Sequence, residues 1–419
     1  MKKVIVRAPA LSQSGYGEHA RFILRALRSK PELFDVYLLN IPWGQTSWLW
    51  EDDEERRWLD SIIEKTVRYG QAGGQFDVSL QVTIPNEWQR IAPVNIGVTA
   101  GIETTKISPQ WVQNSLQMDK IILTSEHAKY GFDNTEVPAF DQSTGQEVTA
   151  KVNIPLEVIG YPVKDVESAE IDIDLKHDFN FLFVGTWITR KNFENTVKWF
   201  VEEFYDQEVG LVVKTTMSKN CLRDRDFVEA KLKVLLEEYE GRKCSVNLIH
   251  GDMSEEEMTG LYNHPKIKAM VNIAHGEGFA LPLFEAAYNG LPIVTTSWSG
   301  HTDFLYMPTK DKKGKSRRTP MFQVVSYDIR PVQKEAVWDG VIQKDAQWCF
   351  AKEWSYKKAL RTTFKEHGAA ISKAKKLQEW VKDEFSEDKQ YEKIAEVVCP
   401  NHKEMDSSIE EMFLQLENK

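Results

Sequence analysis

The feature that most constrains the fold is an alternation of short apolar runs and amphipathic stretches, which occurs twice along the chain. Apolar runs rich in Val and Ile predict strands, and amphipathic stretches predict helices. In the first half we expect strands at 3–8, 34–40, 76–81, 95–100 and 120–124, and helices at 18–29, 48–69 and 111–118. In the second half we expect strands at 180–185, 211–215, 246–250, 269–273 and 292–296, and helices at 192–204, 226–239, 254–262 and 284–288.

Strands that alternate with helices form parallel sheets with crossover connections. Two successive alternating halves predict an α/β protein with two Rossmann-like domains that face each other. The length of 419 residues also suggests two domains. Ligands of such proteins bind at the carboxyl ends of the strands, in the cleft between the halves.

Composition defines the domain limits less sharply than the alternation does. We expect the limits 1–164, 165–384 and 385–419, with the linker at 158–162 and in the acidic segment 165–174. The polar segment 133–149 is interpreted as a loop or hairpin excursion. After Phe304 the pattern is irregular, and helices dominate from Ser355 onward.

Charge and cysteine content exclude some classes of function. The net charge of −10 argues against a surface that coats nucleic acid broadly. The four cysteines form no close pair, so neither a disulfide framework nor a metal framework is expected. No apolar run approaches 18 residues, so we expect a cytoplasmic protein without a membrane-spanning segment. The basic segment 310–318 is either a solvated loop or a contact for an anionic acceptor; the oligomeric state stays open.

The segment 275–294 carries the strongest chemical pattern, because Glu277 and Glu285 lie eight positions apart around a glycine and an apolar run. The loop 278–281 can offer backbone N–H groups, and a helix follows it. Helix N-termini and N–H nests bind phosphates, whereas carboxylates repel them and suit hydroxyls. This layout fits a ligand with sugar hydroxyls on both sides of a diphosphate. A surface loop with two solvated glutamates is the alternative.

The segment resembles the Glu-x7-Glu signature of retaining glycosyltransferases with the GT-B fold, the group 1 family that includes mannosyltransferase-like and sucrose synthase-like enzymes. The resemblance implies two facing Rossmann-like domains with a deep interdomain cleft, and C-terminal helices that return to the first domain. It implies that residues 1–164 bind the acceptor and 165–384 the donor. Glu277 would contact the donor sugar and Glu285 the ribose. Backbone N–H groups would come from Gly278, Phe279, Ala280 and Leu281.

Further candidates follow the other predicted strands of the second domain. Arg190 and Lys191 are two adjacent cations that can stabilise a departing diphosphate. Many relatives have Arg directly after the glycine, where this chain has Thr186. The remaining candidates for donor contacts here are Lys214, His250, Gly251, Gly300, His301 and Thr302.

In the first domain, a loop with two glycines follows the first strand and lets a ligand approach the backbone closely. It resembles the Gly-rich loop of GT-B first domains, and its candidates are Gly15, Tyr16 and Gly17. Glu103 is the candidate polar group near the reacting carbon, whereas His127 is interpreted as structural.

The sequence therefore predicts a retaining glycosyltransferase that moves a hexosyl or pentosyl group from a UDP- or GDP-sugar to an acceptor hydroxyl. By analogy with the family, no metal is required, because Lys and Arg take its electrostatic role. The acceptor could be a glycan, a lipid-linked sugar, a protein or a modified base in DNA. A nucleotide-sugar epimerase of the same fold and a non-catalytic nucleotide-sugar-binding protein remain alternatives.

Overall fold

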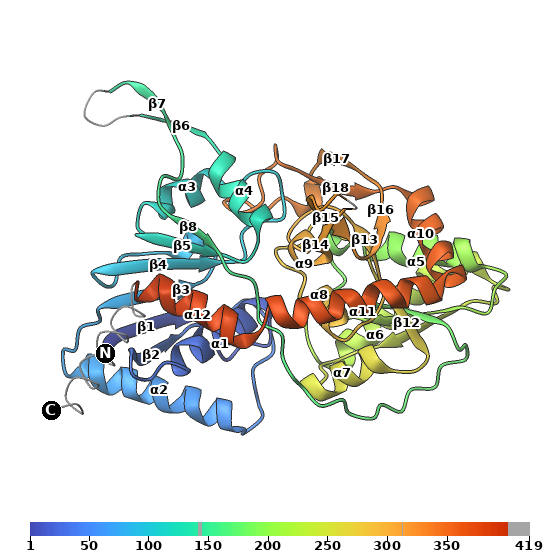
Figure 1. The fold of residues 1–419 in the computed structure, drawn as a ribbon, viewed down its shortest axis with the longest axis horizontal. Coiled ribbons are helices and arrows are strands. Elements are labelled where there is room, and N and C mark those ends of the chain that lie inside the picture. Colours follow the sequence, from blue (N-terminus) through green and yellow to red (C-terminus); the bar gives the residue numbers. More distant parts are fainter. Residues whose placement is uncertain (141–144, 312, 401–419) are drawn as a thin grey trace.

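The first half of the chain forms a parallel six-stranded sheet with the order β2-β1-β3-β4-β5-β8. The computed structural model describes residues 1–140, 145–311 and 313–400 (Figure 1). The strands are β1 (Lys2–Ala8), β2 (Phe34–Asn40), β3 (Val78–Val82), β4 (Val94–Thr99), β5 (Lys120–Leu123) and β8 (Leu156–Val158). All of them pair in parallel, as the alternating pattern predicts.

The helices of this half begin where a polar side chain can cap them. They are α1 (Gly15–Arg28), α2 (Glu54–Gln71), α3 (Pro109–Ser115) and α4 (Glu126–Asn134). The caps are Ser14, Asp53, Ser108 and Ser125, each of which accepts a backbone N–H of the first turn. The expectation of helix from residue 48 was wrong, because Asp53 caps α2 and Trp48 forms a β-bridge with Ser12.

The second half repeats this architecture in the order β11-β10-β9-β12-β13-β16. Its strands are β9 (Asn180–Val184), β10 (Gly210–Lys214), β11 (Ser245–Ile249), β12 (Ile267–Asn272), β13 (Ile293–Thr296) and β16 (Gln323–Val325). Its helices are α5 (Phe193–Phe204), α6 (Leu222–Leu236), α7 (Glu255–Asn263), α8 (Leu281–Tyr288) and α9 (Thr302–Leu305). The strand order reverses between β9 and β12, and ligands of doubly wound sheets bind at that point.

Several short elements escaped the sequence analysis. Val158 closes β8, so the segment 158–162 is not purely linker. The irregular region after Phe304 supplies β16 and two hairpins, β14 (Tyr306–Lys310) with β15 (Ser316–Pro320) and β17 (Tyr327–Pro331) with β18 (Gln347–Ala351). The described part of the basic segment 310–318 therefore belongs to a hairpin. In the first half, β6 (Val137–Phe140) and β7 (Glu147–Ala150) pair as a hairpin, as expected for 133–149.

Four short 3₁₀ turns complete the described elements: η1 (Pro85–Glu87), η2 (Thr189–Lys191), η3 (Glu237–Tyr239) and η4 (Lys334–Ala336). Among the helices of the described ranges, none is both long and apolar enough to cross a membrane.

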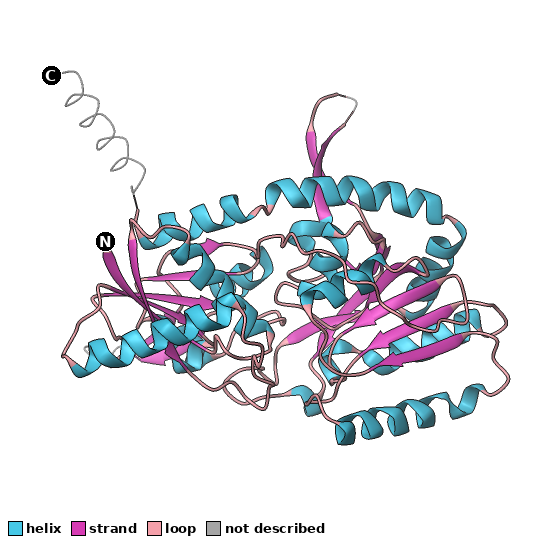
Figure 2. Cartoon of the chain, turned by 90° about the horizontal axis from the view of Figure 1, so that it is seen from below, coloured by secondary structure: helices cyan, strands magenta, loops and turns pink. Residues whose placement is uncertain are grey.

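Three helices end the described chain, and the last two of them connect the two halves: α10 (Glu353–Lys365), α11 (His367–Glu384) and α12 (Glu387–Val398). Figure 1 shows α11 and α12 in red, running from the second sheet to the first, and Figure 2 shows the same crossing from below. α11 packs on α8, and α12 packs on α1. Tyr391 of α12 lies with its ring centroid 6.1 Å from that of Phe22 of α1.

One hydrophobic core extends through both halves. Phe279 lies within it, and its ring is 5.0 Å from Tyr161 of the first half and 5.1 Å from both Phe284 and Phe304 of the second. The side chain of Phe279 is therefore a packing element, so only its backbone can serve a ligand. The domain limits 1–164, 165–384 and 385–419 stay predictions.

The docking of α12 on α1 can be tested at Ile394, which is fully buried. We expect Ile394→Ala to lower the free energy of unfolding by about 2–5 kcal/mol, because it removes buried methyl groups and leaves a cavity. Urea denaturation measures the effect. Lys393→Ala, at an exposed position of the same helix, should change stability by less than about 0.5 kcal/mol. Equal effects of the two variants would contradict the docking.

Candidate active site

Three loops at the carboxyl ends of β9, β12 and β13 hold residues in strained backbone conformations. Asn192, Ala280 and Ser299 have φ angles of 51°, 73° and 78°. They are the non-glycine residues with positive φ in the described ranges. Such conformations cost free energy and cluster at functional sites. The three loops that the sequence pattern singled out are thus also the strained ones.

Glu277 is the centre of the contacts among these loops. Its carboxylate accepts hydrogen bonds from Lys191 Nζ at 2.7 and 2.8 Å, from Arg190 Nη1 at 3.1 Å and from Asn272 Nδ2 at 2.9 Å. The residue is 4% exposed. Burial alone would raise its pKa, but Lys191 and Arg190 lower the pKa to about 2. Glu277 therefore stays ionised at neutral pH.

Arg190 connects this carboxylate to the first domain. Its Nη1 lies 3.2 Å from Glu103 Oε1 and donates to the carbonyl oxygen of Gly276 at 2.8 Å. Burial would lower the pKa of Arg190, yet Glu103 and Glu277 raise it. The pKa of Lys191 is lowered by burial, which Glu277 only partly offsets. The four side chains predicted as catalytic thus form one interdomain cluster.

The loop after β13 is joined to the Glu277 loop by two hydrogen bonds. The backbone N–H of Glu277 donates to Ser299 Oγ at 2.9 Å, and that of Gly300 donates to the Glu277 carbonyl at 2.9 Å. Ser125 of the first domain donates to the carbonyl of Gly278 at 2.8 Å. A Cβ on Gly278 would lie 3.0 Å from the carbonyl oxygen of Ala100. The expected deep interdomain cleft is therefore closed at this loop, because glycines let the two backbones meet.

Glu285 lies in a different environment from Glu277. Its Oε2 accepts a hydrogen bond from the Tyr262 hydroxyl at 2.7 Å. Burial raises the pKa of Glu285 to about 7, although the Tyr262 hydroxyl opposes this rise. Lys164 and Met253 help to line a small cavity beside Glu285. The two glutamates of one motif thus have pKa values shifted in opposite directions.

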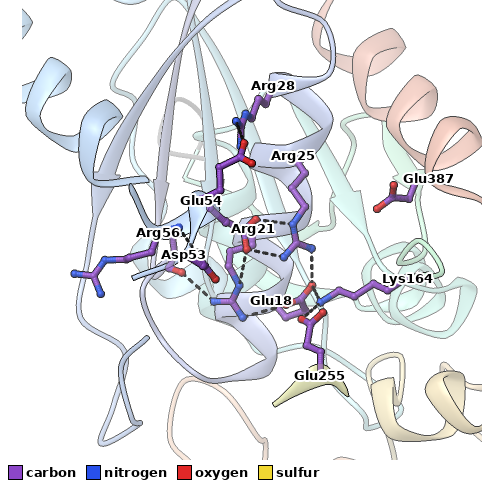
Figure 3. Close-up of polar contacts among 12 residues, drawn as sticks. Glu18, Arg21, Arg25, Arg28, Asp53, Glu54, Arg56, Lys164, Glu255 and Glu387 are labelled. Carbon is purple, nitrogen blue, oxygen red and sulfur yellow. Dashed lines mark hydrogen bonds and ion pairs between the residues drawn. The ribbon is translucent and has the colours of Figure 1, made fainter. Parts of the chain in front are cut away.

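An ion-pair network that includes Lys164 and Glu255, two residues that line this cavity, joins the two halves of the chain (Figure 3). Lys164 Nζ, from the linker, lies 2.8 Å from Glu18 Oε1 of α1 and also pairs with Glu255 of α7. Arg21 and Arg25 each pair with Glu18 at 3.0 Å. Burial opposes ionisation of Glu18, but these cations hold its pKa well below its ordinary value. Sequence reasoning missed Lys164 and Glu18, since a charge pattern does not reveal pairs across a linker.

Several other predicted residues use their side chains within the fold. His250 Nε2 lies 2.8 Å from Asp224 Oδ2, and His301 Nε2 lies 2.8 Å from the carbonyl of Thr296. Thr302 donates its hydroxyl proton to the carbonyl of Ser299 at 2.8 Å. Their backbone groups, rather than these side chains, are left as candidate ligand contacts.

The Gly-rich loop of the first domain shows a similar division. Tyr16 bonds to the Thr99 hydroxyl at 2.8 Å, and a Cβ on Gly17 would lie 1.8 Å from the carbonyl oxygen of Ser12. Gly17 is therefore required for packing, whereas a Cβ on Gly15 would meet no atom within 4 Å.

Three further predicted positions lie at or after the carboxyl ends of β9, β10 and β11. Burial lowers the pKa of Lys214, and the negative charges of Asp252 and Glu285 offset this only in part. Thr186 and Gly251 lie in the loops after β9 and β11. Among the described residues no group of three or more His, Cys, Asp or Glu side chains is gathered as a metal ion would need.

No protein-family model matches the chain, and no curated protein matches its sequence. Solved structures match it in fold. A sucrose-phosphate synthase from Thermosynechococcus elongatus gives a TM-score of 0.59 at 12% identity, over 97% of this chain and 100% of its own. HepE of Anabaena in complex with UDP and glucose gives 0.55 at 12% identity, over 95% and 99%. A trehalose-6-phosphate synthase from E. coli bound with UDP-2-fluoro glucose gives 0.53 at 10% identity, over 93% and 97%.

These similarities, together with the two parallel six-stranded sheets, show that the chain has the GT-B fold. The fold is shared with glycosyltransferases whose structures hold UDP and UDP-glucose.

The close approach of the two loops can be tested at Gly300, since a Cβ there would lie 1.9 Å from the carbonyl oxygen of Gly278. We expect Gly300→Ala to lower the free energy of unfolding by about 1–3 kcal/mol, because the loops must move apart. Thermal or urea denaturation measures this. Gly368→Ala, where a Cβ meets no atom within 4 Å, is the control and should be neutral or slightly stabilising.

The raised pKa of Glu285 predicts a pH-dependent stability. The folded protein holds a proton on Glu285 up to about pH 7, whereas the unfolded chain releases it near pH 4.5. Glu285 therefore destabilises the fold progressively between pH 4.5 and 7, by about 3 kcal/mol at most above pH 7. We expect Glu285→Gln to raise the melting temperature at pH 8 and to have little effect near pH 5. The exposed Glu379→Gln is the control, and a pH-independent gain at Glu285 would contradict the assignment.

Proposed function

We propose that this protein is a retaining glycosyltransferase that moves a sugar from a nucleotide-diphosphate sugar to an acceptor hydroxyl. The observation that carries the proposal is the buried cluster of Glu277, Arg190 and Lys191 at the point where the second sheet reverses its strand order. Matching structures hold UDP and UDP-glucose, so UDP-sugars are the first donors to test and GDP-sugars the second.

Arg190 and Lys191 are suited to the chemistry of the leaving group. When the bond between the anomeric carbon and the phosphate oxygen breaks, negative charge accumulates on the diphosphate. Fixed cations in a buried site stabilise that charge without reorganising. Both cations contact Glu277 in the structure, so a bound diphosphate would share them with this carboxylate.

Backbone groups would complete the diphosphate site. The left-handed conformation of Ala280 directs the chain into α8, whose first-turn N–H groups lack partners within the helix. Such N–H groups bind anions. Glu285 would then accept hydrogen bonds from the ribose hydroxyls, and Glu277 from a hydroxyl of the transferred sugar.

We infer retention by analogy with the GT-B enzymes that the Glu277–Glu285 segment resembles. Glu277 is assigned to a sugar hydroxyl and no carboxylate is assigned as a nucleophile for a double displacement, so we propose attack on the front face, assisted by the departing phosphate. The acceptor oxygen forms its bond to the anomeric carbon on the face from which the phosphate leaves. The acceptor proton passes to the departing phosphate oxygen, so that charge and atoms balance. The acceptor approaches from the side of the first domain, where Glu103 contacts Arg190. A glycan is the favoured acceptor, and the net charge of −10 disfavours DNA.

The proposal can be tested with Lys191→Met and Glu277→Gln. We expect Lys191→Met to lower kcat for donor hydrolysis or transfer about 100-fold or more, because a cation at the leaving group is lost. Glu277→Gln should lower both kcat and the affinity for the donor, because it alters the contact with the sugar and removes the negative charge that pairs with Arg190 and Lys191. Assays with a panel of UDP- and GDP-sugars measure these effects, and NMR of the product reports its anomeric configuration.

Lys176→Met, which removes an exposed lysine of the same domain, is the matched control and should retain full activity. Failure of the unaltered protein to bind any nucleotide sugar would reject the proposed function. An inverted product would reject retention alone.

A further inference from the structure

We propose that a cavity in the second domain, walled by the segment 326–351, binds an uncharged oligosaccharide as part of the acceptor. The cavity measures about 630 Å³, within the range of pockets that hold small-molecule ligands. The inference rests on the proposed transferase function, since it assigns the class of acceptor. None of the residues on which the family resemblance rests lies in the segment 326–351, so this wall belongs to the particular chain rather than to the shared motifs.

The cavity lies next to the candidate active site. Thr189 and Asn192 line it, and these residues flank Arg190 and Lys191, whose side chains contact Glu277. His275 also lines it, two positions before Glu277, and its backbone N–H donates to the carbonyl of Arg190 at 2.8 Å. Residues that line the cavity are therefore only one or two positions in the chain from the charged residues assigned to the reaction.

A chain of hydrogen bonds fixes the wall of the cavity. Trp348 Nε1 donates to Gln333 Oε1 at 2.8 Å, and Gln333 Nε2 lies 3.0 Å from His275 Nε2. His275 Nδ1 lies 2.6 Å from the carbonyl oxygen of Cys349. This pattern requires the proton on Nδ1, so that Nε2 accepts from Gln333. Burial lowers the pKa of His275 and keeps the ring neutral, which agrees with that tautomer.

The groups around the cavity suit hydroxyls and apolar sugar faces. Phe350 offers aromatic surface, Ile188, which is 42% exposed, offers apolar surface, and Asn195 offers an amide. Aromatic rings provide flat apolar area with little loss of side-chain entropy, against which the C–H face of a sugar can pack. Amides and carboxylates accept hydrogen bonds from hydroxyls.

The charges around the cavity argue against an anionic ligand. Two carboxylates, Glu194 and Glu335, line it with one ammonium group, that of Lys231. Lys231 already lies 4.6 Å from the Trp187 ring centroid and 3.9 Å from Glu194. A surplus of negative charge repels phosphates and nucleic acid and is compatible with an uncharged sugar.

The cavity continues toward the first domain, which argues for a chain of sugars. Met217 lines both this cavity and a neighbouring one of about 740 Å³, to which Gln45 of the first domain contributes. The segment around Gln45 includes Trp48 and Trp50, which are 52% and 76% exposed. An oligosaccharide can therefore extend from the second domain to the half that is expected to hold the acceptor.

The test uses full-length protein and short neutral oligosaccharides, with and without UDP, and measures binding by calorimetry and saturation-transfer NMR. Glu335→Trp, which places a large side chain at the cavity, should raise the Kd of the best oligosaccharide about tenfold or more and leave the Kd of UDP unchanged. Lys334→Trp, at the neighbouring exposed position outside the lining, is the matched control and should bind as the unaltered protein does. In transfer assays Glu335→Trp should raise the acceptor KM while donor hydrolysis stays constant.

Asn195→Ala is a second test, because it removes an amide without adding volume. It should raise the Kd of the oligosaccharide without altering the Kd of UDP. Lack of binding by every neutral oligosaccharide, preference for an anionic glycan or oligonucleotide, or normal binding by Glu335→Trp would each overturn the inference. Failure of nucleotide-sugar binding would instead reject the proposed function, since oligosaccharide binding is measured without UDP as well.

Discussion

The ion pairs of Glu277 with Lys191 and Arg190 are the interaction on which the site depends. A buried carboxylate without partners is strongly unfavourable, so it must be paired or protonated. Here two cations and the Asn272 amide satisfy it. Because Arg190 also pairs with Glu103, the same solution joins the two domains. The close packing at Gly278 and Gly300 serves the same contact, because side chains at these positions would separate the backbones that bring these charges together.

The fold was predictable because its main strands are buried on both faces and are continuously apolar. Val4, Val6 and Leu182 are typical of such strands and are fully buried. β8 and β16 have three residues each, too few for a period to be measured. The hairpins after Phe304 were missed because most of their residues are only partly buried or exposed, and β15 carries the charged residues Arg317 and Arg318. Hydrophobic patterning therefore reveals the sheets and misses the additions to their edges.

The site was predictable to the extent that topology determines it. Arg190 and Glu277 follow β9 and β12, neighbouring parallel strands, so their carboxyl ends had to meet. The partners of side chains were not predictable in this way. His250 and Asp224 come from the loop after β11 and from α6, and Gln333 reaches His275 from a segment without a clear pattern. Such contacts depend on loop paths, which neither periodicity nor motif spacing defines.

The charges of the cluster constrain how a diphosphate can enter it. Arg190 and Lys191 balance Glu277 and Glu103, so the four side chains together carry no excess positive charge. A diphosphate that binds both cations would share them with Glu277 and Glu103, and this sharing weakens the ion pairs that compensate the buried carboxylates. Hydroxyls of the sugar can replace the cations at Glu277, whereas Glu103 is half of an interdomain contact. Binding of the proposed donor at this site would therefore be coupled to the contact between the domains, and a ligand that carries both a diphosphate and sugar hydroxyls would offer partners to the cations and to Glu277.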